Sequence, residues 1–477
     1  MTIPTSLRAG IDLLDRKGGL VRIRRPVDPV GEVTAVMTAL EERGDWSAVV
    51  FESVKGYDGW RIAGSLFSDR SNVAALLGAD LERLVPELSE RFGHPVPTRK
   101  TRSAPSQDVV HTGDEASLDN IPLVWHHERD AGRYISMGLT FVKDPDTGTS
   151  NVGIYRYMQR DDRTLVPSLT SISNIADIFR RQEARGRPLD IAIVPSASAA
   201  MTLAASYRAA LGTDECTLAG ALQLAPVELV PARTVEVDVP ADAELVIEAR
   251  IQPGERYPEA PFADMSGSYS RVKHGPLVSV SAITRRRDPI LQLAFSGHAD
   301  ATNMAAICHE VAIWRAVQAS SSNVVAVHVP ASGYGFHCYL AIRKEPTVEG
   351  GERGEQRNAM LAALGAVPQI KLIIAFDHDV DIFNEHRVLG ALAKRFQAID
   401  PRTGRTRLTT IGDMKGATYD PSSFHREYPN SKLMIDATIP TDLDPSVRAA
   451  FDEAKPGWPQ AIDLDAYLGL GEGNRPG

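Results

Sequence analysis

Two short polar clusters, far apart in the chain, contain the side chains best suited to proton chemistry. The first runs from Asn151 to Arg156, and the second, from Glu259 to Asp264, carries two carboxyl groups. An arginine stays protonated at any working pH, so it can hold one carboxylate ionised and oriented while a second carboxyl exchanges a proton. Such a set suits proton transfer beside a developing carbanion.

The local pattern around each cluster indicates how its side chains could meet. In a regular strand side chains alternate between faces, so Asn151 and Arg156 would point to opposite sides, and we predict a bulge at Gly153 that brings them round. Pro261 cannot donate to a sheet, which predicts that residues 259–264 form a loop at a strand end, where side chains can converge on a ligand. Taken alone, this cluster also fits a surface loop with two solvated acids.

Hydrophobic periodicity divides the chain into parts that would position these clusters. Residues 1–110 mix helical periodicity with short β-rich runs and predict a small α/β unit, whereas residues 111–302 hold many short strands and few helices, typical of a barrel or strongly curved sheet. An apolar stripe predicts a linker helix over 303–322. Residues 323–445 alternate as a compact α/β domain does, and residues 446–477 form a tail that begins with a short helical segment.

Composition limits the classes of partner. The 477 residues, 43% of them hydrophobic, suffice for two or three domains. A formal charge of -9 disfavours nucleic acid, which needs a basic face. Neither a signal-peptide core nor an apolar run near the ~20 residues of a membrane helix occurs, so we expect no membrane partner and a cytoplasmic location. Cys216, Cys308 and Cys338 are scattered, which predicts reduced, buried thiols.

His126 and His127 stand directly before a predicted strand. Two neighbours on a regular element cannot both face one metal, so we expect local hydrogen bonding rather than ligation.

The order and spacing of several motifs resemble those of the UbiD-type decarboxylases, which use prenylated FMN. The family pattern N-x-x-x-x-R followed by E-G-P-[FY]-G-[DE] stands here as Asn151 with Arg156 and then E-A-P-F-A-D. Between them, G-T-D-E ending at Glu215 stands where the family has an acidic metal ligand in a G-V-[ST]-E context. Downstream, Lys371 precedes a strand that ends in an acidic run, and Arg395 sits where a family arginine follows the next helix. The resemblance covers most of the chain.

This resemblance implies an α+β fold: an N-terminal α/β unit with a flavin-binding split β-barrel, a linker helix and a C-terminal α/β domain, with the active site in the cleft between domains. It implies that Arg156, Glu259 and Asp264 are the catalytic set. We assign the transferred proton to Asp264 and the ion-paired, orienting role to Glu259, with the reverse assignment open. The cofactor-binding residues that it implies are Asn151, Ile154, Tyr155, Arg156, Glu215, Lys371 and Arg395.

The resemblance also implies a divalent ion against the flavin phosphate. Asn151 and Glu215 would hold Mn²⁺ or Mg²⁺, with K⁺ as a further candidate. The chain has no GxxxxGKS loop, so a buried phosphate needs another source of positive charge, and an oxygen-ligated cation would supply it. Where the family usually places a metal-binding histidine the segment reads Ser171-Ile-Ser-Asn174, so Asn174 would have to serve as a weaker, neutral third ligand.

A second departure lies in the acidic cluster. Both glycines of E-G-P-F-G are alanine here, Ala260 and Ala263, which adds two methyl groups near the expected pocket and disfavours any backbone conformation with positive φ. We expect a reshaped pocket rather than a disabled one.

The activity implied is reversible, non-oxidative decarboxylation of an aromatic or heteroaromatic acid, such as an indole- or phenazine-type carboxylate, with hydroxybenzoates and acrylic acids next. CO₂ would be the second small-molecule partner, and a separate flavin prenyltransferase would supply the cofactor. The resemblance also implies a homodimer or a higher homo-oligomer. Three other functions remain open: an FMN-dependent oxidoreductase, a catalytically silent flavin-binding protein and, more remotely, a glycosidase that uses the two carboxylates.

Overall fold

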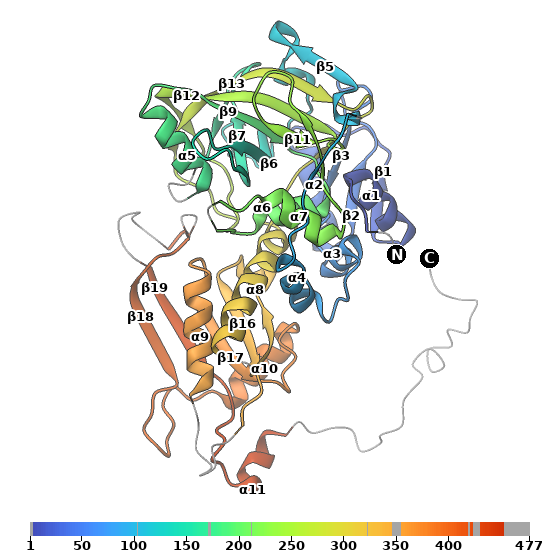
Figure 1. Cartoon of the computed structure of the whole chain (residues 1–477). Coiled ribbons are helices and arrows are strands. Elements are labelled where there is room, and N and C mark those ends of the chain that lie inside the picture. Colours follow the sequence, from blue (N-terminus) through green and yellow to red (C-terminus); the bar gives the residue numbers. More distant parts are fainter. Residues whose placement is uncertain are drawn as a thin grey trace, which may run out of the picture.

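The computed structural model describes residues 3–102, 104–169, 173–210, 212–321, 323–345, 354–417, 420–422 and 430–452. An N-terminal α/β unit and a β-barrel lie side by side at one end of the molecule, and a C-terminal α/β domain lies at the other (Figure 1). The long helix α8 (Ala299–Ser320) runs between the two ends. The predicted α+β class is therefore confirmed. The predicted tail falls largely outside the described residues; within them it holds the short helix α11 (Pro445–Arg448).

The N-terminal unit is a four-stranded sheet with helices packed on it. Its order is β1-β2-β3-β14. Apolar faces of the helices bury Leu14, Val33 and Leu77 in hydrophobic clusters that the N-terminal unit shares with the barrel. The elements are α1 (Leu7–Arg16), β1 (Leu20–Ile23), α2 (Glu32–Glu42), β2 (Ala48–Phe51), β3 (Arg61–Gly64), α3 (Arg70–Leu77), α4 (Leu84–Phe92) and β14 (Ile290–Gln292).

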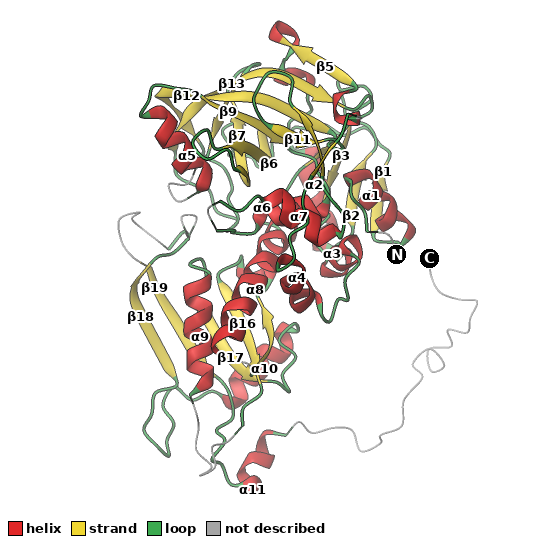
Figure 2. Ribbon diagram, viewed as in Figure 1, coloured by secondary structure: helices red, strands yellow, loops and turns green. Residues whose placement is uncertain are grey.

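Six antiparallel strands close into the barrel. Their order is β12-β9-β6-β7-β8-β13, with β12 pairing back onto β13, and β5 extends the sheet beyond β13 (Figure 2). Inward-facing branched residues such as Ile193, Ile247 and Val278 are fully buried and fill its interior. The strands are β5 (Val109–Thr112), β6 (Tyr134–Lys143), β7 (Ser150–Gln159), β8 (Thr164–Pro167), β9 (Leu189–Val194), β12 (Leu245–Glu259) and β13 (Lys273–Arg285).

Two runs that read as barrel strands belong to other sheets. Residues 290–292 form β14, which pairs in parallel with β3 of the N-terminal unit. Residues 228–231 form β10 (Glu228–Pro231), which pairs with β11 (Asp238–Pro240) and β4 (Arg99–Lys100) in a separate three-stranded sheet. Three helices flank the barrel: α5 (Asn174–Glu183), α6 (Ala199–Ser206) and α7 (Glu215–Gln223).

The predicted bulge at Gly153 is wrong. Gly153 pairs regularly with Thr140, and the register shift lies on the neighbouring strand β6, between Ile135 and Gly138, opposite Arg156. Gly153 serves a different purpose, because a methyl group there would lie 2.9 Å from the ring of Tyr155.

The C-terminal domain is a five-stranded mixed sheet of order β15-β16-β17-β19-β18, with the two central pairings parallel. Helix α8 and helix α9 pack on the same face and share a core with the sheet that includes Ile313, Leu340 and Met360. The elements are β15 (Val324–His328), β16 (His337–Ile342), α9 (Glu355–Ala366), β17 (Leu372–Asp377), α10 (Glu385–Arg395), β18 (Leu408–Met414) and β19 (Asn430–Asp436).

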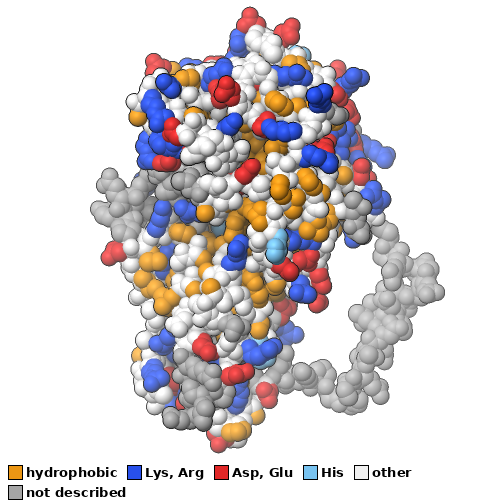
Figure 3. Space-filling model, in the orientation of Figure 1, with side chains coloured by type: hydrophobic (Ala, Val, Ile, Leu, Met, Phe, Trp, Pro, Cys, Tyr) orange, Lys and Arg blue, Asp and Glu red, His pale blue; other side chains and the backbone are white. Residues whose placement is uncertain are grey.

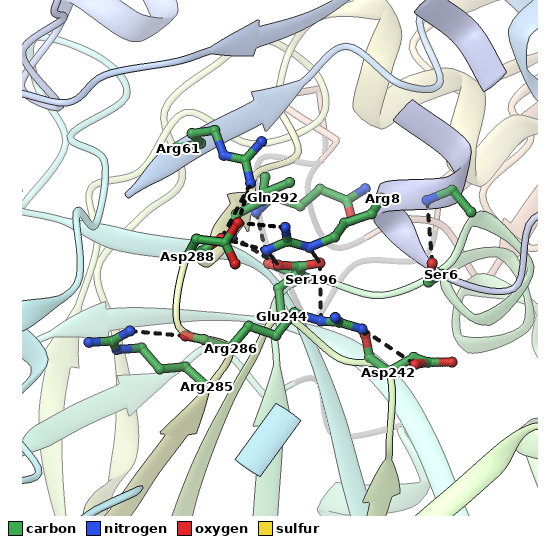
Figure 4. A network of polar contacts seen from close by, with 12 residues as sticks. Ser6, Arg8, Arg61, Ser196, Asp242, Glu244, Arg285, Arg286, Asp288 and Gln292 are labelled. Carbon is green, nitrogen blue, oxygen red and sulfur yellow. Dashed lines mark hydrogen bonds and ion pairs between the residues drawn. The ribbon is translucent and has the colours of Figure 1, made fainter. Parts of the chain in front are cut away.

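A buried ion cluster ties helix α1 to the barrel (Figure 4). Glu244, which has no exposed surface, accepts two hydrogen bonds from Arg8, at 2.7 Å from Nε and 2.8 Å from Nη2. Arg286 lies 3.5 Å away, and the backbone N–H of Ile290 donates to the same carboxylate at 3.2 Å. Because α1, the start of β12 and β14 all meet here, the cluster fixes how the N-terminal unit sits on the barrel.

The surface carries both signs of charge, interspersed over the face shown in Figure 3, while hydrophobic side chains gather near the waist between the two ends. Within the described ranges, every helix is too short or too polar to span a bilayer.

Candidate active site

One guanidinium holds both carboxyl groups of the second cluster. Arg156, on β7, donates from Nε to Glu259 Oε1 at 2.8 Å and from Nη2 to Glu259 Oε2 at 3.1 Å. Its Nη1 donates to Asp264 Oδ2 at 2.7 Å, and Nη2 also donates to the hydroxyl of Ser270 at 3.1 Å. The alternative of a solvated surface loop is therefore wrong, because only 9% of the Arg156 side chain and none of the Glu259 side chain is exposed.

The two acids differ in how many of their carboxylate oxygens are bonded to Arg156. Both oxygens of Glu259 accept hydrogen bonds from Arg156. Asp264 gives one oxygen to Arg156, the other accepts the backbone N–H of Met265 at 2.9 Å, and 17% of its side chain is exposed. Asp264 is therefore the acid that a ligand can reach.

Aromatic rings and one further carboxylate support the loop that carries these acids. Phe262 lies under the Arg156 guanidinium, 4.8 Å from ring centre to carbon, and packs on Tyr134 at 4.4 Å. Buried Asp130 accepts the backbone N–H of Ala263 at 2.9 Å and that of His127 at 2.9 Å. Contacts with residues outside the loop thus fix its backbone, which keeps both acids within hydrogen-bonding distance of Arg156.

The electrostatics follow from burial and charge. Burial lowers the pKa of Arg156, but the carboxylates of Asp264 and Glu259 outweigh it, so its pKa lies above the ordinary value and the guanidinium stays charged. Burial, with the Glu259 charge adding to it, raises the pKa of Tyr134, whose hydroxyl is therefore neutral. A permanent cation and a neutral phenol therefore flank the two carboxyl groups.

The alanine substitutions have different consequences. Ala260 adopts φ 93° although it has a side chain, a conformation that favours glycine, whereas Ala263 keeps a negative φ and pairs with Tyr269 in a β-bridge. The strain expected from these alanines thus falls on Ala260 alone. The side chains of both are buried, so the two methyl groups do add to the packing under the loop.

Residues of the first cluster line a separate cavity of about 280 Å³ at the other end of β7. Asn151 donates to Glu215 Oε1 at 2.9 Å, and the N–H of Val152 donates to Glu215 Oε2 at 2.7 Å. Glu215 is the first residue of α7, and Asn174 is the first of α5, so two helix N-termini meet here. The residues lining the cavity include Asn151, Val152, Gly153, Ile154, Tyr155, Ser173, Asn174, Tyr207, Arg208 and Glu215.

This cavity fits a cation. Burial raises the pKa of Glu215 to about 7 despite the two hydrogen bonds it accepts, because no cation pairs with it among the described residues. Carboxylate and amide oxygens are the ligands that Mg²⁺ and Mn²⁺ prefer. The structure brings Asn151, Glu215 and Asn174 together, with Ile154 and Tyr155 beside them, whereas Ser171 and Ile172 lie outside the described residues.

Two predicted cofactor residues lie apart from this cavity. The amine of Lys371 pairs with Asp420 at 2.8 Å and donates to Ser422 at 2.6 Å. Arg395 ends α10 and pairs with Asp379, at the opposite end of β17 from Lys371. Both cations are already engaged by carboxylates of the C-terminal domain.

A further cavity, of about 560 Å³, combines residues that the motifs did not indicate. It lies between the N-terminal unit, the start of α8 and the C-terminal domain, with Trp46, His298, Tyr334 and Phe383 in its wall. It abuts the Asp264 loop, because a methyl group added at Gly267 would lie 3.7 Å from the ring of Tyr334. Glu41 holds His298 through a 2.6 Å hydrogen bond. Scattered single residues of this kind leave no periodic signal.

His126 contradicts the expectation of local hydrogen bonding. Both its ring nitrogens are buried without a partner in the described part of the chain, and burial lowers its pKa to about 4. The ring packs edge-on against Phe262 instead.

Sequence models of three carboxy-lyase domains match this chain in order. The N-terminal domain of 3-octaprenyl-4-hydroxybenzoate carboxy-lyase matches residues 11–92, the Rift-related domain residues 98–299 and the C-terminal domain residues 302–437.

Full-length relatives agree. A phenolic acid decarboxylase of Sedimentibacter hydroxybenzoicus is 30% identical over 93% of each chain. The UbiD-class enzyme HmfF from Pelotomaculum thermopropionicum, solved with FMN, has a TM-score of 0.88 at 33% identity over 97% of this chain and 100% of its own. An evolved dimeric form of HmfF, solved with prenylated FMN, has a TM-score of 0.85 at 30% identity, covering 97% and 100%. With all three domains matched, the chain belongs to the UbiD family of carboxy-lyases.

Proposed function

We propose that this protein catalyses the reversible, non-oxidative decarboxylation of an aromatic or heteroaromatic carboxylic acid with prenylated FMN. The observation that carries the proposal is the buried set in which Arg156 holds Glu259 and Asp264 together. Loss of CO₂ from an sp² carbon leaves an electron pair that no side chain can delocalise, and the bound prenylated flavin supplies an electrophilic centre for it.

The residues of this chain divide the remaining work. Arg156 and Glu259 form a fixed, buried pair that orients the substrate and the flavin. Asp264 gives its proton to the carbon that CO₂ leaves, and it takes the proton back in the carboxylation direction. Asp264 is partly exposed, and only one of its oxygens is bonded to Arg156. Both observations support Asp264, rather than Glu259, as the proton donor.

The large cavity supports a flat, extended substrate. Its volume of about 560 Å³ lies within the usual range for small-molecule sites, and half-exposed Trp46, Tyr334 and Phe383 offer aromatic faces. We therefore propose a fused-ring acid, of the indole or phenazine type, ahead of single-ring acids.

The cation site completes the proposal. Asn151, Glu215 and Asn174 would hold Mn²⁺ or Mg²⁺ beside the flavin phosphate, with K⁺ as a further candidate. A separate flavin prenyltransferase would supply the cofactor, and we propose a homodimer or a larger homo-oligomer.

The test is to produce the chain together with a flavin prenyltransferase, to measure the mass of the bound cofactor and to screen fused-ring and single-ring acids for CO₂ release. We expect release from a fused-ring acid without added reductant. Turnover that needs NADH would instead indicate an FMN-dependent oxidoreductase. Bound flavin with no turnover of any acid would indicate a silent flavin-binding protein.

A further inference from the structure

The cavity around Glu215 contains one cation that no motif indicated. Of the described residues that line it, Glu215 and Arg208 are the charged ones. Arg208 lies in the connection between α6 and α7, and Ser206, Tyr207 and Ala209 on either side of it line the cavity as well. A guanidinium therefore stands at the wall of a cavity in which the other charged side chain, among the described lining residues, is the buried carboxylate of Glu215.

Arg208 is also free to bind a ligand. It is exposed, and within the described ranges its side chain has neither a hydrogen bond nor an ion pair. Two cations that lie outside the lining are engaged elsewhere: Lys371 pairs with Asp420, and Arg181 of α5 pairs with Asp144. Among the described residues that line this cavity, Arg208 is thus the cation that is available to a ligand.

The surroundings favour an anion beside the cation site. Helix α5, ten residues long, begins at the cavity with Asn174, and the positive end of its dipole points there. The carboxylate of Glu215 alone would repel a phosphate, so positive charge must come from a metal ion, from Arg208 or from both. Asn174 offers a neutral amide, which is a weaker metal ligand than an imidazole. Arg208 must therefore supply more of the positive charge that a phosphate needs here.

We propose that Arg208 binds the flavin phosphate directly and gives this protein part of its preference for FMN over flavins without a phosphate. The inference rests on the proposed function and names a ligand contact within it. The planar guanidinium offers several N–H donors to the oxygens of one phosphate, so its loss should weaken phosphate binding specifically.

The experiment titrates the full-length apo-protein with FMN and with riboflavin, following the quenching of flavin fluorescence, in the presence of Mn²⁺. The chains compared are the unmodified protein, Arg208→Gln, Arg208→Lys and Arg187→Gln. Arg187 is a matched control, because it is an exposed arginine beyond the opposite end of α5. We expect Arg208→Gln to raise the Kd for FMN about tenfold or more and to leave the Kd for riboflavin unchanged, because hydrogen bonds to charged groups are worth about 1.5–3 kcal/mol. Arg208→Lys should fall between, and Arg187→Gln should match the unmodified chain.

A repeat in EDTA asks whether Arg208 acts on the phosphate or through the metal. The ratio of the Kd for FMN of Arg208→Gln to that of the unmodified chain should be the same without metal as with it. An unchanged Kd for FMN, an equal loss for both flavins, or a ratio that disappears in EDTA would overturn the inference while leaving the proposed function standing. Failure of the unmodified chain to bind FMN at all would overturn both.

Discussion

At the scale of single residues, the account depends on one arginine that serves two acids. A lysine could not replace it, because an ammonium lacks the planar fork that grips Glu259 with two bonds while a third reaches Asp264. The motifs that resemble the UbiD family predicted this set, whereas the acidic cluster taken alone also fitted a surface loop. They could not predict Arg208 or His298, whose roles arise only from the neighbours that the fold brings to them, and for Lys371 they missed the carboxylate that engages it.

Asn174 offers a test of the cation site. Replacing it with histidine should strengthen metal binding, because an imidazole nitrogen is a better ligand for Mn²⁺ than a neutral amide oxygen. We expect Asn174→His to retain at least about tenfold more Mn²⁺ than the unmodified protein after dialysis against a chelator, measured by elemental analysis. Equal retention in the two proteins would mean that position 174 does not touch the ion.

Buried histidines predict a loss of stability in acid. Burial lowers the pKa of His126 and of His309 from 6.5 to about 4, so the folded state resists a proton that the unfolded chain accepts. The stability they contribute is complete above pH 6.5 and is lost as the pH falls from 6.5 to 4, by about 1.4 kcal/mol per pH unit for each histidine.

Replacing His126 with leucine should therefore remove about half of this histidine-dependent slope. Urea unfolding at several pH values between 6.5 and 4 measures it. Exposed His94→Gln is the control and should keep the full slope, and an unchanged slope in His126→Leu would contradict the account.

At the scale of elements, periodicity predicted where strands occur but not which sheet they join. The β-branched runs at 227–230 and 290–294 predicted strands, and the structure has β10 and β14 there. Both pair outside the barrel, because strand partners are set by contacts between residues far apart in the sequence. The bulge was likewise assigned to the wrong strand: glycine at 153 makes room for Tyr155, and the extra residue lies on β6. Pro261 predicted the end of a strand, and β12 does end nearby, at Glu259.

The backbone of that loop makes a prediction of its own. Ala260 holds φ 93°, where an alanine side chain is strained and glycine is not. Ala260→Gly should therefore raise the free energy of unfolding by about 1 kcal/mol, although glycine normally lowers it. Denaturant unfolding measures the change. The control is Ala263→Gly, at a negative φ in the same loop, which should destabilise; stabilisation of both would contradict the argument.

At the scale of the whole molecule, the site depends on how three parts are joined. The N-terminal unit supplies Trp46 and Glu41 to the large cavity, and the C-terminal domain supplies Tyr334. The acids held by Arg156 do not line this cavity; they belong to the barrel and the loop that follows β12. The order of these parts could be read from the sequence, but the joints could not, because a contact such as Arg8 with Glu244 spans the chain without any local signal. The ion cluster of Figure 4 is one such joint.

Removing the charge of Glu244 should loosen that joint. Glu244→Gln removes the buried carboxylate between Arg8 and Arg286, although Arg8 keeps Asp288 and Arg286 keeps Asp242. It should lower the free energy of unfolding by about 2 kcal/mol, the order expected for hydrogen bonds to a charged group. Asp146→Asn, which breaks surface pairs with Arg181 and Arg185, should lower it far less, because water screens exposed ion pairs. Similar losses in the two variants, measured by urea unfolding, would show that the Glu244 cluster has no special role.

The central claim is that Asp264 transfers the proton to the carbon that loses CO₂. Its most direct test is hydrogen exchange, in the decarboxylated product, at the carbon that bears the carboxyl group in the acid. In D₂O, the protein loaded with prenylated FMN should introduce deuterium at that carbon of a product arene. Asp264→Asn should bind the same cofactor, by mass and absorbance, yet exchange at least about a hundredfold more slowly. Exchange by Asp264→Asn at the unmodified rate would contradict the account.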